Sequence, residues 1–245
     1  MQAPGVCAVL HARLSELGSA DRAEGQKRYL HSDLTHFGIR LPLLRQTTRQ
    51  VLQEHDLDLP DRLELVEELW RQPVFDLRLA AVQVLDQSKR ELDVSHLDLI
   101  ERLIGTAHTW ALVDPLATDV TGAILQRHPQ ARAVLDRWII SSNFWIRRAA
   151  MLAQLRPLRA KPDRTTFEPF ATYADRVLDE QEFFIRKAIG WVLREVGKRN
   201  ATLVIDWLAP RTHRASGVTM REAVKYLPAA DAARLMNAYR ARTVS

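Results

Sequence analysis

The sequence is poor in cysteine, glycine and long hydrophobic runs, and each scarcity excludes a class of protein. A single cysteine, Cys7, cannot form an internal disulfide, which is typical of a protein from a reducing compartment. No hydrophobic run approaches the roughly 20 residues that span a bilayer. The first residues, MQAPGVCAVLHARL, lack the basic start and long apolar core of a signal peptide. We therefore expect a cytoplasmic protein without membrane contact.

Motifs for metal ligands are also lacking. The eight histidines are scattered without the close spacing of metal-binding motifs, and we interpret them as surface or packing residues. The hydrophobic content of 47% and the charged content of 27% fit a globular protein. We expect neither a metal nor a cofactor.

Positive charge is concentrated in the C-terminal part of the chain. Residues 141–245 contain 19 Lys and Arg against 10 Asp and Glu, whereas residues 1–140 contain 16 against 20. This asymmetry indicates either a surface for a polyanion or a merely solvated helical surface. Charge alone does not separate the two.

Hydrophobic residues recur at the spacing of an α-helix. Most segments have apolar residues at i, i+3, i+4 and i+7, and the alternating pattern of strands is scarce. The chain has only nine glycines, and most of its prolines fall between the periodic runs. The sequence therefore predicts an all-α protein.

Four of the predicted helices share one pattern. They begin at Phe75, Phe144, Phe183 and Val218, with the sequences FDLRLAAVQVL, FWIRRAAMLAQL, FFIRKAIGWVL and VTMREAVKYL. Each has an arginine three residues after its start and an alanine five residues after it. The arginines are Arg78, Arg147, Arg186 and Arg221. The starts lie 69, 39 and 35 residues apart, so a degenerate copy is expected near residue 110, where Trp110 stands.

A two-helix repeat of this length is typical of HEAT-like solenoids. The small alanine allows paired helices to approach closely, and the aromatic residue fills the core between repeats. Such a solenoid has a concave face that serves as an extended binding surface. The repeated arginines lie near helix starts, where they contact either a phosphate backbone or acids within the repeat, and we favour the ion pairs. We expect one domain over residues 1–245.

The degenerate copy, HTWALVD, departs from this repeat. Trp110 replaces the leading phenylalanine, the arginine is lost, and Asp114 takes the position of Arg148 and Lys187 in the next two copies. A carboxylate repels DNA phosphates, so its presence beside an indole indicates a role other than binding. The alternative is that Asp114 caps a helix that Pro115 begins.

A second tryptophan lies on a basic helical face. Trp191 precedes Arg194 by three residues in KAIGWVLREVGKR, and Lys198 follows one turn later. Arg148 directly follows a repeat arginine and points another way, so one of the two can contact the core and the other the binding face. Trp191 and Trp110 have the alternative of being core residues. The remaining tryptophans are expected in the core: Trp70, Trp138, Trp145 and Trp207.

These segments resemble the bacterial DNA alkylation repair family, the AlkD-type DNA glycosylases. FFIRKAIGWVLREVGK is similar to the family's C-terminal signature, and FWIRRAAMLAQL is similar to its W-x-x-R-x-A-x-L segment. TMREAVKYL resembles its terminal S-K-R-E-x-x-K motif. RYLHSDLTHFGIRLPLLR resembles its N-terminal pattern of Tyr, Phe-Gly-Ile, Pro and Arg. The resemblance covers residues 20–230 of the sequence.

The resemblance implies a single domain of HEAT-like repeats that cradles duplex DNA in its concave face. Members of the family hydrolyse the N-glycosidic bond of positively charged N3- and N7-alkylated purines. By resemblance, Trp110 and Trp191 flank the lesion, and Asp114 is the catalytic carboxylate. Arg148 grips a phosphate, and Tyr29 lines the cleft. The predicted DNA-binding set also includes Lys187, Arg194 and Lys198.

The chain departs from the family in the catalytic segment. Relatives commonly have W-W-D-x-V-D, whereas this chain has TWALVD over residues 109–114. The first tryptophan and the first acid are lost, while the second of each remains. This departure leaves a runner-up, a non-catalytic HEAT-repeat protein that binds structured or damaged DNA. A protein-binding scaffold is a third alternative.

The chemistry of an alkylated purine determines what the site must supply. The cationic base is already a good leaving group, so no general acid is needed. Asp114 would stabilise the positive charge that develops on the deoxyribose and orient a water, and the faces of Trp110 and Trp191 would favour that charge. We therefore expect a monofunctional enzyme that neither uses a lyase step nor holds the base in a protein pocket. We expect a monomer whose partner is duplex DNA, in the cytoplasm and on the nucleoid.

Overall fold

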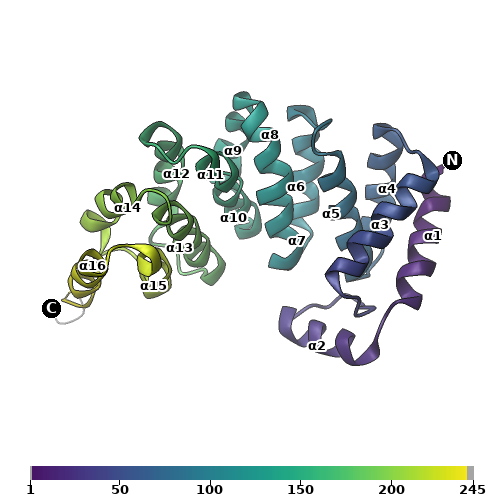
Figure 1. Ribbon diagram of the computed structural model, residues 1–245, viewed down its shortest axis with the longest axis horizontal. Coiled ribbons are helices and arrows are strands. Elements are labelled where there is room, and N and C mark those ends of the chain that lie inside the picture. Colours follow the sequence, from purple (N-terminus) through teal and green to yellow (C-terminus); the bar gives the residue numbers. More distant parts are fainter. Residues whose placement is uncertain (1, 242–245) are drawn as a thin grey trace. The chain divides into compact units, whose positions relative to one another are not determined.

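The computed structural model describes residues 2–241, and its regular elements are helices (Figure 1). The only β contact in this range is an isolated parallel bridge between Thr35 and Val74. The predicted all-α fold is therefore confirmed. Over the same residues, each helix is too short or too polar to cross a bilayer.

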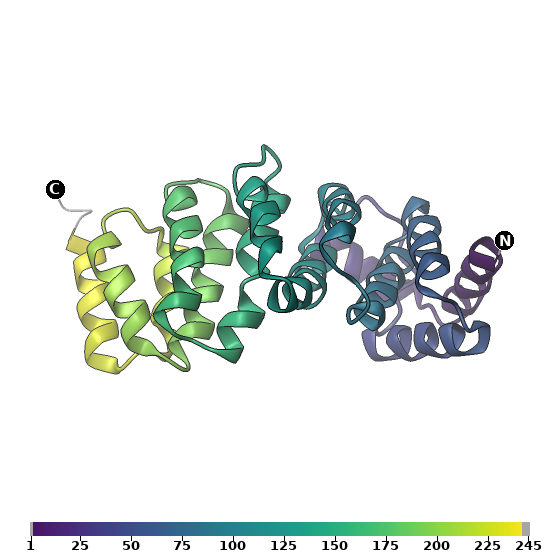
Figure 2. The same ribbon diagram turned by 90° about the horizontal axis from the view of Figure 1, so that it is seen from above.

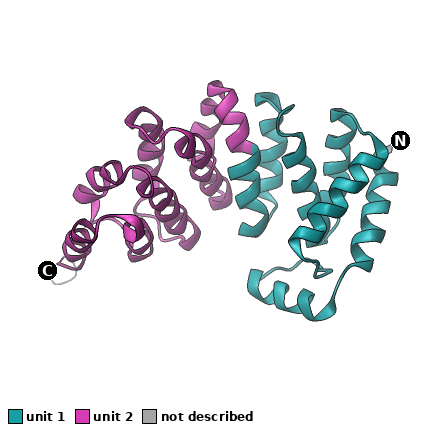
Figure 3. Ribbon diagram, in the orientation of Figure 1, with its two compact units in different colours: residues 1–120 teal, residues 121–245 magenta. Residues whose placement is uncertain are grey.

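The helices form two compact units, Met1–Val120 and Thr121–Ser245 (Figure 3). In unit 1, α4 packs against α1 and α5, and α3 packs against the same two helices. The elements of unit 1 are α1 (Gln2–Glu16), α2 (Ala20–Leu30), α3 (Leu41–His55), α4 (Leu59–Arg71), α5 (Phe75–Ser88), η1 (Val94–His96), α6 (Leu97–Gly105) and α7 (Trp110–Pro115). A π-helix, η2 (Leu116–Thr121), follows α7 directly.

In unit 2, successive helices lie side by side along the chain (Figure 2), and α13 packs against α10, α14 and α15. The first elements of the unit are α8 (Gly122–Arg127), η3 (Pro129–Ala131), α9 (Arg132–Trp138), α10 (Phe144–Leu152), α11 (Leu155–Ala160) and α12 (Arg164–Val177). They are followed by α13 (Phe183–Gly197), α14 (Ala201–Leu208), η4 (Ala209–Arg211), α15 (Gly217–Ala223), η5 (Val224–Tyr226) and α16 (Ala229–Ala241).

The sequence repeat corresponds to a structural repeat. The helices α5, α10 and α13 begin at the leading phenylalanines, and α15 begins one residue before Val218. The degenerate copy is a helix as well, because α7 begins at Trp110. The repeated alanines have no exposed surface: Ala80, Ala149, Ala188 and Ala223. The helical-repeat prediction is therefore confirmed.

The repeat arginines fasten each helix to the turn before it. Arg78 donates to the Gln72 carbonyl at 3.2 Å, and Arg147 donates to the Ser141 carbonyl at 2.6 Å. Arg186 donates in the same way to a carbonyl six residues back, at 2.8 Å. These bonds satisfy backbone carbonyl groups that no helical hydrogen bond uses. The expected ion pair is seen at Arg147, which pairs with Glu180 at 2.7 Å, whereas the acceptors for Arg78 include backbone carbonyls and those for Arg186 a carbonyl and the Gln181 side chain.

Gly190 allows α13 and α15 to approach closely. A Cβ atom at this position would lie 2.7 Å from the Cβ of Glu222 and 3.1 Å from the carbonyl oxygen of Thr219. Both neighbours belong to the backbone or to its first side-chain atom, so neither can rotate away. The contact between the two helices therefore requires glycine at residue 190.

We expect Gly190→Ala to destabilise unit 2. Overpacking costs about 1–3 kcal/mol, which outweighs the gain of about 1 kcal/mol that alanine brings to a helix. The measurement is guanidinium unfolding followed by circular dichroism. Gly25→Ala is the control, because a Cβ there meets nothing within 4 Å and should stabilise α2. A Gly190→Ala protein at least as stable as the wild type would contradict this account of the helix contact.

Candidate functional site

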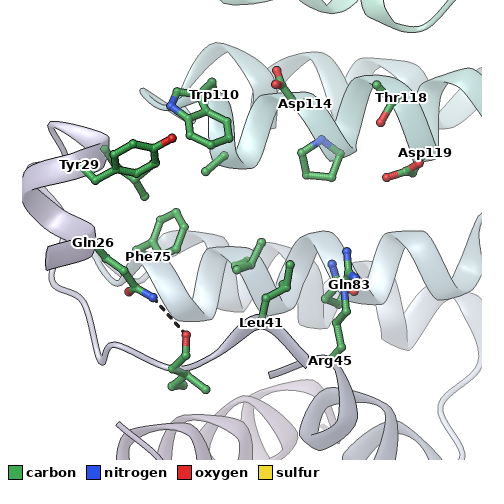
Figure 4. Close-up of a pocket in the computed structure, with 15 residues that line it drawn as sticks. Gln26, Tyr29, Leu41, Arg45, Phe75, Gln83, Trp110, Asp114, Thr118 and Asp119 are labelled. Carbon is green, nitrogen blue, oxygen red and sulfur yellow. Dashed lines mark hydrogen bonds between the residues drawn. The ribbon is translucent and has the colours of Figure 1, made fainter. Parts of the chain in front are cut away.

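Unit 1 contains a cavity of about 410 Å³ beside α7, here named the α7 pocket (Figure 4). The helix α7 and the π-helix η2 form one wall, and α5 forms the opposite wall. Helices α2 and α3 close the sides. The lining residues are Gln26, Tyr29, Leu30, Ile39, Leu41, Arg45, Phe75, Leu79, Gln83, Trp110, Ala111, Asp114, Pro115, Thr118 and Asp119.

Three of the predicted site residues meet in this pocket. The side chain of Thr109 accepts a hydrogen bond from the backbone N–H of Ala111, which caps α7 and places Trp110 at its first position. The ring of Tyr29, from α2, meets Trp110 edge to face at a centroid distance of 5.9 Å. Tyr29 is 70% exposed, so its ring is available to a ligand. Asp114 lies on the same wall one turn after Trp110.

The alternative prediction for Asp114, a cap on a helix that begins at Pro115, is wrong. Thr109 caps the helix, and both Asp114 and Pro115 lie inside it. Local preference favours Asp-Pro as a helix start. The repeat overrides that preference, because α7 starts at the position that the other repeat helices use.

The chain departs from regular α-helical geometry directly after Pro115. Proline has no N–H to donate, which removes one hydrogen bond of the α-helical pattern. The chain continues as the π-helix η2, in which each turn contains more residues than in an α-helix. Residues five apart in an α-helix point about 140° away from each other. The wider turn instead allows both Asp114 and Asp119 to line the α7 pocket.

A buried carboxylate organises the linker between α2 and α3. Asp76, on α5, is 1% exposed and accepts hydrogen bonds from the backbone N–H groups of Phe37 at 2.7 Å and Ile39 at 3.2 Å. The linker is also tied to the start of α5, since Thr35 donates to the carbonyl of Pro73 at 2.9 Å. No pattern in the sequence indicates this role of Asp76.

The linker in turn holds α2. Arg22 donates to the carbonyl of Gly38 at 2.8 Å, and Gln26 donates to the carbonyl of Ile39 at 3.1 Å. Gly38 has φ +78°, and a Cβ atom there would lie 2.3 Å from the carbonyl oxygen of Ser19. Because α2 has no buried residue of its own, these polar contacts determine where it presents Tyr29.

The six tryptophans fall into a buried group and a partly exposed group. Trp70, Trp138, Trp145 and Trp207 are buried, which confirms their prediction as core residues. Trp110 and Trp191 are both partly exposed. The core alternative for these two is therefore wrong in its simple form, and each presents part of its indole to solvent.

In unit 2, α13 carries the predicted cations beside Trp191. Lys187 and Arg194 both form ion pairs with Glu222 of α15, with a Lys187 Nζ–Oε1 distance of 2.8 Å. Lys198 pairs with Glu195 at 2.6 Å. These acids come from the neighbouring turn and the neighbouring helix, and the sequence analysis did not anticipate them.

The environment of Glu222 keeps it ionised. Burial alone would raise the pKa of Glu222, but hydrogen bonds from Lys187 and Lys225 and the charge of Arg194 outweigh burial and lower the pKa to about 2. The carboxylate therefore remains charged at every pH at which the protein is expected to work.

Arg148 is buried between α10 and α13. It is 3% exposed, donates to the carbonyl of Phe184 at 2.6 Å, and places its guanidinium 5.7 Å from the centre of the Phe184 ring. These contacts join two repeat helices. Its predicted role in gripping a phosphate stays a prediction.

Comparisons with known proteins agree on one family. A model of the family described as DNA alkylation repair enzyme matches residues 10–227. A solved structure described as a predicted DNA alkylation repair enzyme from Enterococcus faecalis is 22% identical, with a TM-score of 0.78, over 86% of this chain and 97% of that one.

Two structures from Streptococcus mutans are also similar. AlkD2 is 18% identical with a TM-score of 0.61, over 78% of this chain and 91% of that one. The protein smu.31 from strain UA159 is 19% identical with a TM-score of 0.61, over 77% and 93%. At these identities the likeness concerns the fold. No curated protein matches the chain.

Removing the Asp76 carboxylate should release the linker and α2. Asp76→Ala leaves one buried and one partly buried N–H group without their acceptor, which should lower the free energy of unfolding by about 3 kcal/mol. Hydrogen exchange of the Phe37 and Ile39 amides measures the local effect, and denaturant unfolding measures the global one. Asp33→Ala, at an exposed acid of the same linker, is the control. Unchanged protection of the two amides in Asp76→Ala would show that the anchor lies elsewhere.

The lowered pKa of Glu222 predicts a dependence of stability on pH. Because the folded-state pKa lies below the ordinary value of 4.5, the charged carboxylate stabilises the fold above about pH 4.5. This stabilisation is lost as the pH falls from 4.5 toward 2. Between pH 7 and pH 3, the melting temperature of the wild type should fall further than that of Glu222→Gln. Equal decreases would contradict the assigned ion pairs.

Proposed function

The chain belongs to the DNA alkylation repair enzyme family, and from this premise we propose that it is a DNA glycosylase for positively charged N3- and N7-alkylated purines in duplex DNA. The observation that carries the proposal is the meeting of Tyr29, Trp110 and Asp114 in the α7 pocket. Two aromatic rings in contact and a carboxylate line this pocket, and they come from segments some 80 residues apart in the sequence.

The chemistry of the pocket suits a dissociative reaction. The alkylated purine leaves as a neutral base, so positive charge accumulates on the deoxyribose as the glycosidic bond breaks. Asp114 stabilises that charge and orients the water that attacks the sugar. The electron-rich faces of Trp110 and Tyr29 favour a cation next to them. The α7 pocket therefore receives the sugar and the water, while the base stays outside it.

The lining of the pocket favours hydrolysis without a lyase step. A lyase step needs a side-chain amine that attacks the sugar and forms a Schiff base. In the described part of the chain, no lysine lines the α7 pocket. The enzyme is therefore monofunctional and leaves an abasic site.

The second tryptophan and the cations of α13 supply the remaining functions. In unit 2, Trp191 offers an aromatic face to the DNA, and Lys187, Arg194 and Lys198 bind the phosphate backbone. Arg148 acts indirectly in this proposal. Its hydrogen bond to the carbonyl of Phe184 holds the start of α13, the helix that carries these cations. The protein acts as a monomer on duplex DNA.

A second candidate function rests on the altered catalytic segment. Thr109 and Ala111 stand where relatives carry a tryptophan and an acid, and Thr109 is used as a helix cap instead. A protein with this substitution could bind damaged or structured DNA without releasing a base. The two functions differ in one observable, the release of the base.

We expect the wild type to release N7-methylguanine from duplex DNA faster than the spontaneous rate. Asp114→Asn should lower the single-turnover rate by about 10²-fold or more, because the charge on the sugar loses its partner, and should leave the Kd for DNA within twofold. Asp119→Asn is the matched control, since it removes the same charge from the same pocket five residues away. Its rate should stay within about threefold of the wild type.

The two variants and the wild type separate the alternatives. Release by the wild type at the spontaneous rate, together with DNA binding, would establish the non-catalytic function. Equal losses in Asp114→Asn and Asp119→Asn would show that the overall charge of the pocket matters and that Asp114 has no specific role.

A further inference from the structure

The charged groups of α13 and α15 form two layers. The acids lie below: the side chain of Glu222 is 8% exposed, and that of Glu195 is 11% exposed. The cations lie above them, with Lys187 at 39% and Lys225 at 50%. We name the group of Lys187, Arg194 and Lys225 around Glu222 the cation array. All three cations are more exposed than the carboxylate that holds them.

One carboxylate holds all three cations of the array. Glu222 accepts from Lys187 Nζ at 2.8 Å and from Lys225 Nζ at 3.1 Å through one oxygen, and from Arg194 through the other. The cations come from α13 and from η5, so the carboxylate joins separate segments. A lysine has three N–H groups and an arginine has five, and only part of them is used by Glu222.

The backbone is shaped for this arrangement. Gly190 lies between Lys187 and Arg194 on α13, and its missing side chain is what lets the Cβ of Glu222 approach. An alanine at residue 190 would push Glu222 away from the two cations. The close contact between α13 and α15 thus positions the carboxylate of Glu222 beside the cations of α13.

The array continues into a second group on α13. Glu195 pairs with Lys198 at 2.6 Å and with Arg159 at 3.3 Å, and Lys198 lies 4.9 Å from the centre of the exposed Tyr226 ring. Together the two groups contain five cations and two carboxylates, a net charge of +3. Such a surface attracts a polyanion.

From these contacts we propose that Glu222 is a positioning residue, which fixes Lys187, Arg194 and Lys225 as a preorganised site for the phosphates of a DNA backbone. Lys225 thereby joins the DNA-binding residues. The proposal rests on the proposed function, since it takes duplex DNA as the ligand. Preorganisation matters because three long side chains would otherwise lose their rotamer freedom on binding.

The positioning role predicts a result opposite to that of simple electrostatics. Glu222→Gln raises the net charge by one, so attraction between charges alone would tighten binding to DNA. If Glu222 fixes the cations, the same substitution weakens binding. We expect about a tenfold rise in Kd, the effect of losing one charge-assisted hydrogen bond. The probe is an undamaged, fluorescein-labelled duplex, with anisotropy measured over a series of salt concentrations.

Two further variants complete the experiment. Glu168→Gln makes the same change of charge at an exposed acid on α12 and should leave Kd unchanged or slightly lower. Lys225→Ala, at a half-exposed side chain, should weaken binding and reduce the slope of log Kd against log salt by about one. This variant keeps the proposal open to refutation even if Glu222→Gln does not fold. Melting temperatures are measured alongside, because a merely structural ion pair would lower them and leave Kd unchanged.

The outcomes separate this inference from the proposed function. Binding by folded Glu222→Gln that equals or exceeds that of the wild type overturns the positioning role, as does an unchanged salt slope in Lys225→Ala. Base release by the wild type in the same preparation shows that the proposed function stands in either case. A wild type that neither binds the duplex at low salt nor releases a base overturns both.

Discussion

The aromatic end of the α7 pocket depends on the buried carboxylate of Asp76. A buried carboxylate is tolerated only when hydrogen bonds replace its lost hydration. Two backbone N–H groups of the linker provide these bonds to Asp76. The linker then holds α2 through Arg22 and Gln26. Since α2 buries no side chain of its own, Tyr29 owes its place beside Trp110 to this chain of polar contacts.

Much of the fold could be predicted because helices and repeats leave periodic patterns. The starts of α5, α10 and α13 coincide with the leading phenylalanines, and even the degenerate copy forms a helix that starts at Trp110. These features are encoded by spacing alone, so a single sequence is sufficient to find them.

What could not be predicted depends on contacts between distant residues. Glu222 lies 28 residues from Arg194 and 35 from Lys187, and no local pattern indicates that one acid serves both. Asp76 likewise acts on a linker 37 and 39 residues away. The alternative of a helix cap at Asp114 fails for the opposite reason, because a strong local preference for capping is overridden by the repeat that sets the start of α7 at Trp110.

The π-helix after Pro115 has a consequence for comparisons between relatives. A π turn is equivalent to one extra residue inserted into an α-helix, so every residue after it is rotated relative to those before it. A relative with an unbroken helix at this point would align with this chain without a gap and yet present a different residue beside Asp114. Which residues after Pro115 line the α7 pocket therefore depends on the type of helix. A sequence alignment with a relative is not enough to assign them.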